Sequence, residues 1–126
     1  MGDYRLEQLD ELISLHNEAR VNRWLWKSKP LSKNNFLMSY AQKWSNKLAV
    51  QNQLYHSSMR DIMSLGFSGA AENIAYGQRS PEAVMKTWLK SPGHRSNILN
   101  SSFTEIGCGM SISENGRLYW CVCFAR

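Results

Sequence analysis

Apolar residues recur at helical spacing in two stretches of the first half of the chain. The first stretch covers residues 6–26, and a polar loop at residues 30–35 separates it from the second. Ser32, Asn34 and Asn35 in this loop are candidate caps of the second helix. The apolar faces of the two predicted helices contain Leu6, Leu9, Ile13 and Ala19 in the first, and Leu37, Tyr40, Ala41, Trp44 and Leu48 in the second.

A third predicted helix starts at Ser80. A serine side chain can accept a hydrogen bond from a free amide of the first turn, and Pro81 and Glu82 suit the first helical positions. This helix must end near residues 91–93 (SPG), because a residue that precedes proline disfavours the helical conformation. His94 then begins a short helix that runs to Leu99.

The C-terminal part predicts a β-hairpin, with strands at residues 106–113 and 118–124. Asn115-Gly116 between them is a strong signal for a two-residue turn. Counting outward from such a turn places Cys108 opposite Cys123. Because helices come first and strands last, the order of elements favours an α+β sandwich around an antiparallel sheet.

Composition indicates one globular domain that spans residues 1–126, with 43% hydrophobic residues. The net charge of +5 comes from scattered lysines and arginines, which argues against a nucleic-acid partner. No apolar run approaches the roughly 20 residues of a transmembrane helix. The N-terminus lacks the pattern of a secretory signal peptide. We therefore expect either that the protein is made without a signal peptide or that one has been removed.

Four segments, in this order and at these separations, resemble the CAP (SCP-like) family of cysteine-rich secretory proteins, antigen 5 and plant pathogenesis-related proteins. They are residues 15–20 (LHNEAR), 71–77 (AENIAYG), 88–99 (WLKSPGHRSNIL) and 106–109 (IGCG). The SPGHR form is similar to microbial members. The resemblance implies a three-layer α/β/α sandwich with a central antiparallel sheet and a C-terminal hairpin. It also implies that the protein is secreted or extracellular.

The resemblance also implies a cleft with two histidines and two glutamates. His56, Glu72 and His94 match three of these positions, and Ser91 stands where the second glutamate would be. Two imidazoles suit zinc, so His56 and His94 are the predicted metal ligands. We expect weak binding because a carboxylate is missing at Ser91. The alternative is that both histidines are hydrogen-bonded residues without a ligand.

Three function classes remain open. The first is a monomeric recognition module without catalysis, whose extracellular ligand is a lipid, a glycan or a protein. The second is a metal-assisted or serine hydrolase that uses Ser57, Ser58 or Ser91, although no Gly-x-Ser-x-Gly elbow is present. The third is a lipid or sterol carrier that uses the apolar segment at residues 59–67.

The family's hairpin cysteines match Cys108 and Cys123, so we predict a disulfide between them and an oxidising compartment, with Cys121 left over. On the first helix, His16, Asn17 and Arg20 are predicted to be structural residues rather than a second site.

Overall fold

The structure is a computed structural model that describes residues 2–21 and 28–126. The first helix contains part of the predicted stretch, and the remainder of that stretch, residues 22–26, lies outside the described residues. The elements in chain order are α1 (Gly2–Val21), β1 (Ser32–Lys33), α2 (Asn35–Gln51), α3 (Met59–Met63), β2 (Ala70–Tyr76), α4 (Pro81–Lys90), α5 (Pro92–Leu99), β3 (Glu105–Ile112) and β4 (Leu118–Ala125).

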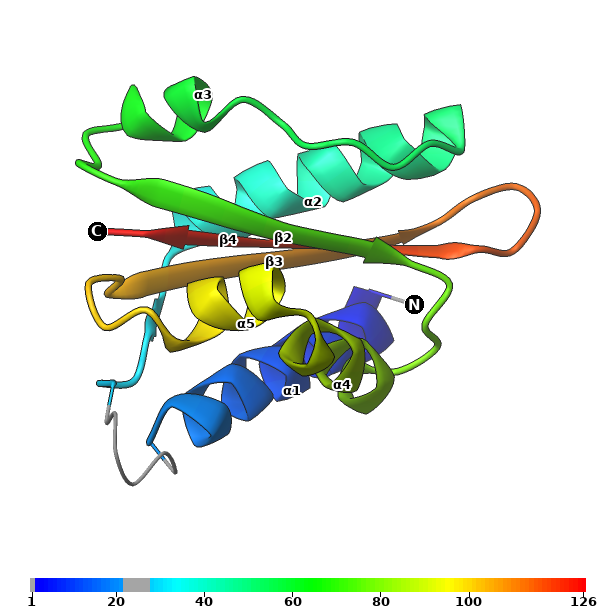
Figure 1. Ribbon diagram of the computed structural model, residues 1–126. Coiled ribbons are helices and arrows are strands. Elements are labelled where there is room, and N and C mark those ends of the chain that lie inside the picture. The colour runs from blue at the N-terminus through cyan, green and yellow to red at the C-terminus, as the bar shows by residue number, and fades with distance from the viewer. Residues whose placement is uncertain (1, 22–27) are drawn as a thin grey trace.

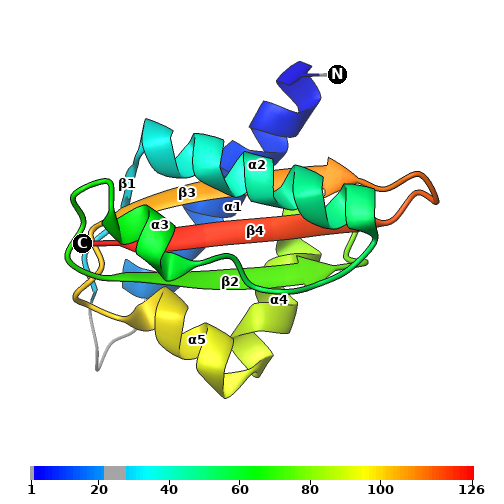
Figure 2. The same cartoon turned by 90° about the horizontal axis from the view of Figure 1, so that it is seen from above.

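A four-stranded sheet forms the middle layer of the molecule, in the order β1-β3-β4-β2. Helices α2 and α3 cover one face, and α1, α4 and α5 cover the other (Figures 1 and 2). The predicted three-layer α/β/α sandwich is therefore confirmed. β3 pairs antiparallel with β4, and β4 pairs antiparallel with β2. The two-residue β1 runs parallel to β3, so the sheet as a whole is mixed.

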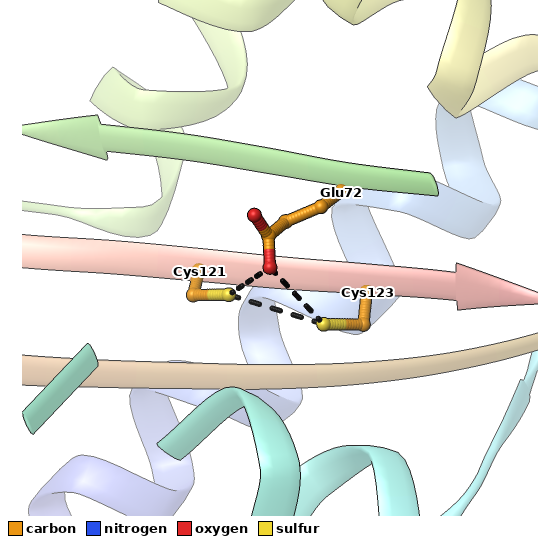
Figure 3. Close-up of side chains that lie close together, drawn as sticks. All are labelled: Glu72, Cys121 and Cys123. Atoms are coloured by element: carbon orange, nitrogen blue, oxygen red, sulfur yellow. Dashed lines mark hydrogen bonds between the residues drawn. The ribbon is translucent and has the colours of Figure 1, made fainter. Parts of the chain in front are cut away.

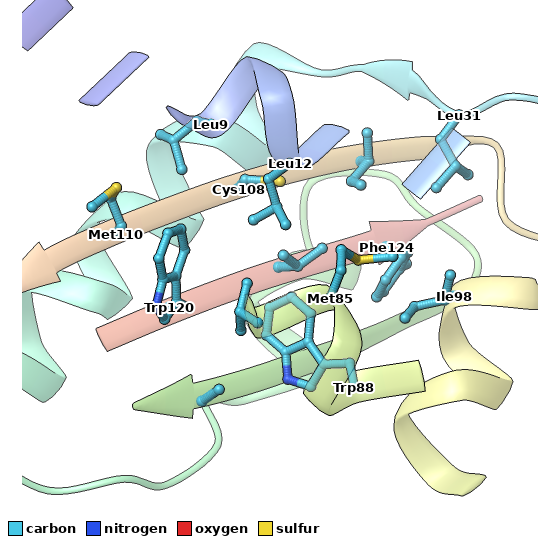
Figure 4. Packing of buried hydrophobic residues seen from close by; sticks show 14 of the residues in the cluster. Leu9, Leu12, Leu31, Met85, Trp88, Ile98, Cys108, Met110, Trp120 and Phe124 are labelled. Carbon is cyan, nitrogen blue, oxygen red and sulfur yellow. The ribbon is translucent and has the colours of Figure 1, made fainter. Parts of the chain in front are cut away.

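Each face of the sheet has its own hydrophobic core, because alternate residues of a strand point to opposite sides. The core under α1, α4 and α5 is the larger and includes Trp88, Trp120 and Phe124, all fully buried (Figure 4). The core under α2 and α3 contains Tyr119, Cys121 and Cys123 from β4, with the buried face of α2 packed on them. All three cysteines are buried and free.

Local sequence signals account for where the helices begin. Asn34, one of the three candidate caps, is the N-cap of α2, and its side chain accepts a hydrogen bond from the Leu37 amide at 2.9 Å. Ser80 caps α4 in the same way through the Ala83 amide, with Pro81 in the first turn. The start of each helix is thus fixed by a side chain that accepts a hydrogen bond from an otherwise unpaired backbone amide.

Helix α2 lies unusually close to β3 at two glycines. A Cβ atom on Gly107 would lie 2.1 Å from the carbonyl carbon of Leu37, and one on Gly109 would lie 2.5 Å from the backbone of Ala41. Real Cβ atoms do not approach other heavy atoms this closely, so only glycine fits at these positions. The two glycines therefore determine how closely α2 packs against the sheet.

The hairpin forms as predicted, but its turn is one residue longer. The Ser113 amide donates to the Arg117 carbonyl at 2.8 Å, and strand pairing resumes with Ile112 opposite Leu118. Gly116 has a positive φ of 83°, which is the left-handed conformation that closes a three-residue loop. The predicted two-residue turn, which would have placed Glu114 opposite Arg117, is therefore wrong.

The predicted disulfide fails for the same reason. Cys108 lies opposite Val122, and Cys123 lies opposite Gly107. Because side chains alternate along a strand, a shift of one residue moves a side chain to the other face of the sheet. Cys108 therefore belongs to the core under α1, whereas Cys123 belongs to the core under α2. The sheet separates the two thiols, and no bridge between them can form.

Candidate functional site

Glu72 is the centre of the candidate site. It lies on β2 directly opposite Cys123 of β4, on the face that α2 and α3 cover. Its side chain is only 1% exposed, so its carboxylate depends on neighbouring donors.

The two carboxylate oxygens of Glu72 have different surroundings. Oε1 accepts hydrogen bonds from the His56 ring nitrogen Nδ1 and from the Ser57 amide, both at 2.9 Å. Oε2 accepts from the Ser57 hydroxyl and faces the thiols of Cys121 at 3.7 Å and Cys123 at 4.0 Å (Figure 3). His56 itself is 61% exposed. Glu72 thus links an exposed histidine to a buried thiol pair.

The predicted residues His94 and Ser91 form a second pair, at the start of α5. His94 Nδ1 lies 2.8 Å from the Ser91 hydroxyl oxygen. The His94 carbonyl accepts from the Asn73 side chain at 3.1 Å, and Asn73 accepts from Asn97 at 2.9 Å. Asn73 follows Glu72 on β2, so this network ties α5 to the strand that carries the carboxylate.

The pKa of His94 is lowered, first by burial and second by the positive charge that His56 would carry. The four predicted residues therefore form two hydrogen-bonded pairs, His56 with Glu72 and His94 with Ser91. His94 favours the neutral imidazole, which is the form that binds metal.

A group that the sequence did not predict lies beneath this site. The ligand atoms of Glu72, Cys121 and Cys123 all lie within 4.8 Å of one another, so the group could hold a metal ion. Neither histidine belongs to this group. The spacing of Cys121 and Cys123 places both on one face of β4, but only strand pairing shows that Glu72 lies beside them.

The prediction that His16, Asn17 and Arg20 are structural residues is confirmed. Asn17 bonds both the amide and the carbonyl of Leu31. The buried Arg20 guanidinium donates to four backbone carbonyls, which belong to Lys29, Ile98, Asn100 and Phe103. Arg20 thereby joins α1 to the end of α5 and to the segment that leads into β3.

His16 is fully buried between the rings of Trp88 and Phe124. Its Nδ1 donates to the Leu12 carbonyl at 2.7 Å, and its Nε2 has no hydrogen-bond partner among the described residues. Burial lowers the pKa of His16 to about 4, the Leu12 bond partly opposes this, and the Arg20 charge lowers it further. The imidazole is therefore neutral in the folded protein at neutral pH.

We expect the stability to fall as the pH drops from about 6.5 to about 4, because an unfolded chain binds a proton at His16 in this window and the folded protein does not. The free energy of unfolding should decrease by about 3 kcal/mol from this residue alone. Urea unfolding at a series of pH values measures the effect. A His16→Phe variant should lose this part of the pH dependence, whereas His56→Ala, at an exposed histidine, should keep it. If the free energy of unfolding changed equally with pH in all three proteins, this pH dependence would not come from His16.

The apolar segment at residues 59–67 is divided between core and surface. Ile62 is fully buried, and Met59 and Phe67 pack against the core under α2. Met63 and Leu65 are exposed. In residues 2–21 and 28–126, no helix has both the length and the apolar character needed to cross a membrane.

The fold and site define a three-layer α/β/α domain with a histidine–glutamate pair at one face of its sheet. Residues 13–124 match the CAP family, described as the cysteine-rich secretory protein family. This chain belongs to that family.

Two relatives come from Bacillus subtilis. The uncharacterized protein YkwD is 36% identical over 107 residues, which cover 79% of this chain and 40% of YkwD. The uncharacterized membrane protein YlbC is 33% identical over 106 residues, which cover 79% of this chain and 30% of YlbC. The chain thus spans less than half the length of both relatives.

Solved structures share the fold. An outer surface protein of Borrelia burgdorferi has a TM-score of 0.83 at 22% identity, covering 95% of this chain and 92% of that one. An extracellular SCP-domain protein of Bacillus anthracis has a TM-score of 0.82 at 25% identity, covering 97% of this chain and 41% of that one. NaASP2, whose structure is described with Zn²⁺, has a TM-score of 0.70 at 14% identity and covers 94% and 78% of the two chains. The first two of these solved structures are of an outer surface protein and an extracellular protein.

Proposed function

We propose that this chain is a secreted or surface-exposed recognition module that holds its ligand at a cleft formed by His56, Glu72, Ser91 and His94. The contacts of Glu72 are the observation that supports this function. Its carboxylate is buried, and both oxygens accept hydrogen bonds from His56 or Ser57. A carboxylate held in this way orients its neighbours and is poorly placed to take a proton from a substrate.

Zinc is the metal that the family resemblance suggests for this cleft, and the two histidines suit it. His56 and His94 both use Nδ1 for a hydrogen bond, to Glu72 and to Ser91 respectively. With Nδ1 engaged, the lone pair of a neutral imidazole at Nε2 remains for a metal. Such an ion would polarise a bound ligand. Two protein ligands make an under-coordinated site, which supports weak and reversible binding.

Isothermal calorimetry at neutral pH should detect a weak zinc-binding step that is absent from a His56→Ala, His94→Ala double variant. Binding should also weaken as the pH falls, because a proton competes with the metal for each imidazole. A Ser91→Glu variant should bind zinc more tightly, since it supplies a second carboxylate next to His94. Persistence of this weak step in the double variant would contradict this proposal.

A serine hydrolase is a second candidate because of one contact. The Ser91 hydroxyl lies 2.8 Å from His94 Nδ1, which is the distance of a nucleophile from its base. The lowered pKa of His94 keeps that base neutral. Acyl transfer also needs donors aimed at the developing oxyanion, and none of the contacts described at this site supplies them.

A screen of peptide, ester and peptidoglycan substrates, with and without zinc, separates the two functions. The recognition module predicts no turnover above background in any condition. Turnover that survives repurification and disappears in Ser91→Ala or His94→Ala would identify a hydrolase and overturn the proposal.

A further inference from the structure

We propose that Cys121, Cys123 and Glu72 form a second metal site, beneath the histidine cleft, for a thiophilic divalent cation of the zinc type. The site uses different ligand atoms from the cleft. Glu72 would contribute Oε2, whereas His56 contacts Oε1. The two sites therefore share one side chain but can be tested separately.

The distances between the three donor atoms fit such an ion. The two Sγ atoms are 3.9 Å apart, and they lie 3.7 and 4.0 Å from Glu72 Oε2 (Figure 3). Zinc binds sulfur at about 2.3 Å and carboxylate oxygen at about 2.1 Å, so donors around it are separated by about 3.8–4.0 Å for sulfur pairs and about 3.6–3.8 Å for sulfur and oxygen. An ion near the centre of this triangle therefore needs only small movements of the side chains.

The backbone holds the three ligands in place before any ion binds. Cys121 and Cys123 are alternate residues of β4, so they point to the same face, and Glu72 lies opposite Cys123 on β2. On β3, the other strand that pairs with β4, Gly109 lies opposite Cys121 and Gly107 lies opposite Cys123. All three ligands thus stand on paired strands rather than on loops, which favours a defined geometry.

The charges also favour a divalent ion. Two thiolates and one carboxylate carry three negative charges, and a divalent cation would neutralise two of them. The hydrogen bonds of Ser57 to Glu72 and the contact with His56 compensate part of the remainder. Thiols bind a metal as thiolates, so binding must displace their protons and should strengthen as the pH rises.

The competing explanation is that the cysteines serve only as small apolar residues. Helix α2 approaches the sheet closely at Gly107 and Gly109, and small side chains on the neighbouring strand fill the remaining space. This explanation predicts that the thiols bind no metal, and it gives Glu72 no role in contacting them.

Titration of the fully reduced protein with Co²⁺ or Cd²⁺ tests the site, because thiolate ligands produce an ultraviolet charge-transfer band that imidazole ligands do not. We expect one ion per chain with this band. Cys121→Ala and Cys123→Ala should each abolish it. Cys108→Ala is the matched control, since Cys108 is equally buried but on the opposite face, and it should leave the band unchanged. The His56→Ala, His94→Ala double variant should also keep the band, which separates this result from the fate of the proposed cleft.

The proposal is overturned if the wild type shows three thiols in denaturant but no charge-transfer band with either ion. It is equally overturned if the band survives in both Cys121→Ala and Cys123→Ala. Should these variants fail to fold, pulsed alkylation of the wild type under native conditions decides the matter, with each site measured by peptide mass spectrometry. Cd²⁺ should slow the alkylation of Cys121 and Cys123 but not that of Cys108, and uniform protection would contradict the site.

Discussion

Replacing Arg20 with methionine is expected to lower the free energy of unfolding by about 4 kcal/mol. The guanidinium is buried, and its three nitrogens donate to four backbone carbonyls at 2.8 to 3.1 Å. Methionine preserves most of the side-chain volume but leaves these carbonyls without donors, and each buried unsatisfied carbonyl costs about 1 kcal/mol or more. Such a loss is a large fraction of the 5–15 kcal/mol by which domains are typically stable.

Urea unfolding followed by circular dichroism measures this effect. Arg95→Met is the matched control, because Arg95 is exposed and makes one long contact of 3.4 Å to the Leu89 carbonyl, so its loss should change stability by less than about 0.5 kcal/mol. Arg20→Lys should recover little of the stability, since one ammonium group cannot reach all four carbonyls that are arranged around the planar guanidinium. If Arg20→Met and Arg95→Met were equally stable, the buried network would have no energetic importance.

A single methyl group on Gly107 or Gly109 is expected to cost about 3 kcal/mol or more. The added Cβ would lie 2.1 Å from Leu37 in one case and 2.5 Å from Ala41 in the other, and both contacts are with backbone atoms of α2. Helical backbone cannot move aside as a flexible side chain can. The helix must therefore lift from the sheet, and this opens gaps in the core beneath it.

Thermal and urea unfolding of Gly107→Ala and Gly109→Ala provide the measurement. Gly93→Ala is the control, because Gly93 lies in α5 with no heavy atom within 4 Å of an added Cβ. Alanine is favoured over glycine in helices, so this variant should be neutral or more stable by up to about 1 kcal/mol. Wild-type stability in Gly107→Ala would show that α2 does not sit as close to β3 as described.

The starts of α2 and α4 and the layered fold were predictable because they depend on short-range signals and on family motifs. Ser80 and Pro81 identify the start of α4, and Asn34 was among the candidate caps of α2. The hairpin was predicted, but its register was not. Asn115-Gly116 favours a two-residue turn, whereas the Ser113 hydroxyl accepts from the Arg117 amide at 3.1 Å and supports a longer loop. A side-chain contact of this kind is not visible in a turn motif.

The candidate site was predictable where a family motif names its residues, and not where it depends on strand pairing. Glu72, Ser91 and His94 lie within the matched segments, and the family resemblance as a whole pointed to His56. The structure places the four residues in two hydrogen-bonded pairs. The approach of Glu72 to Cys121 requires the pairing of β2 with β4. Residues 70–76 gave no clear strand pattern, so this pairing could not be derived from the sequence.

The strand order also determines when the sheet can form during synthesis. β4 contains the last strand residues of the chain, yet it lies between β3 and β2 and pairs with both. β2 is made about forty residues earlier and pairs along its whole length with β4. A growing polypeptide therefore cannot assemble the sheet until residues 118–125 have left the ribosome.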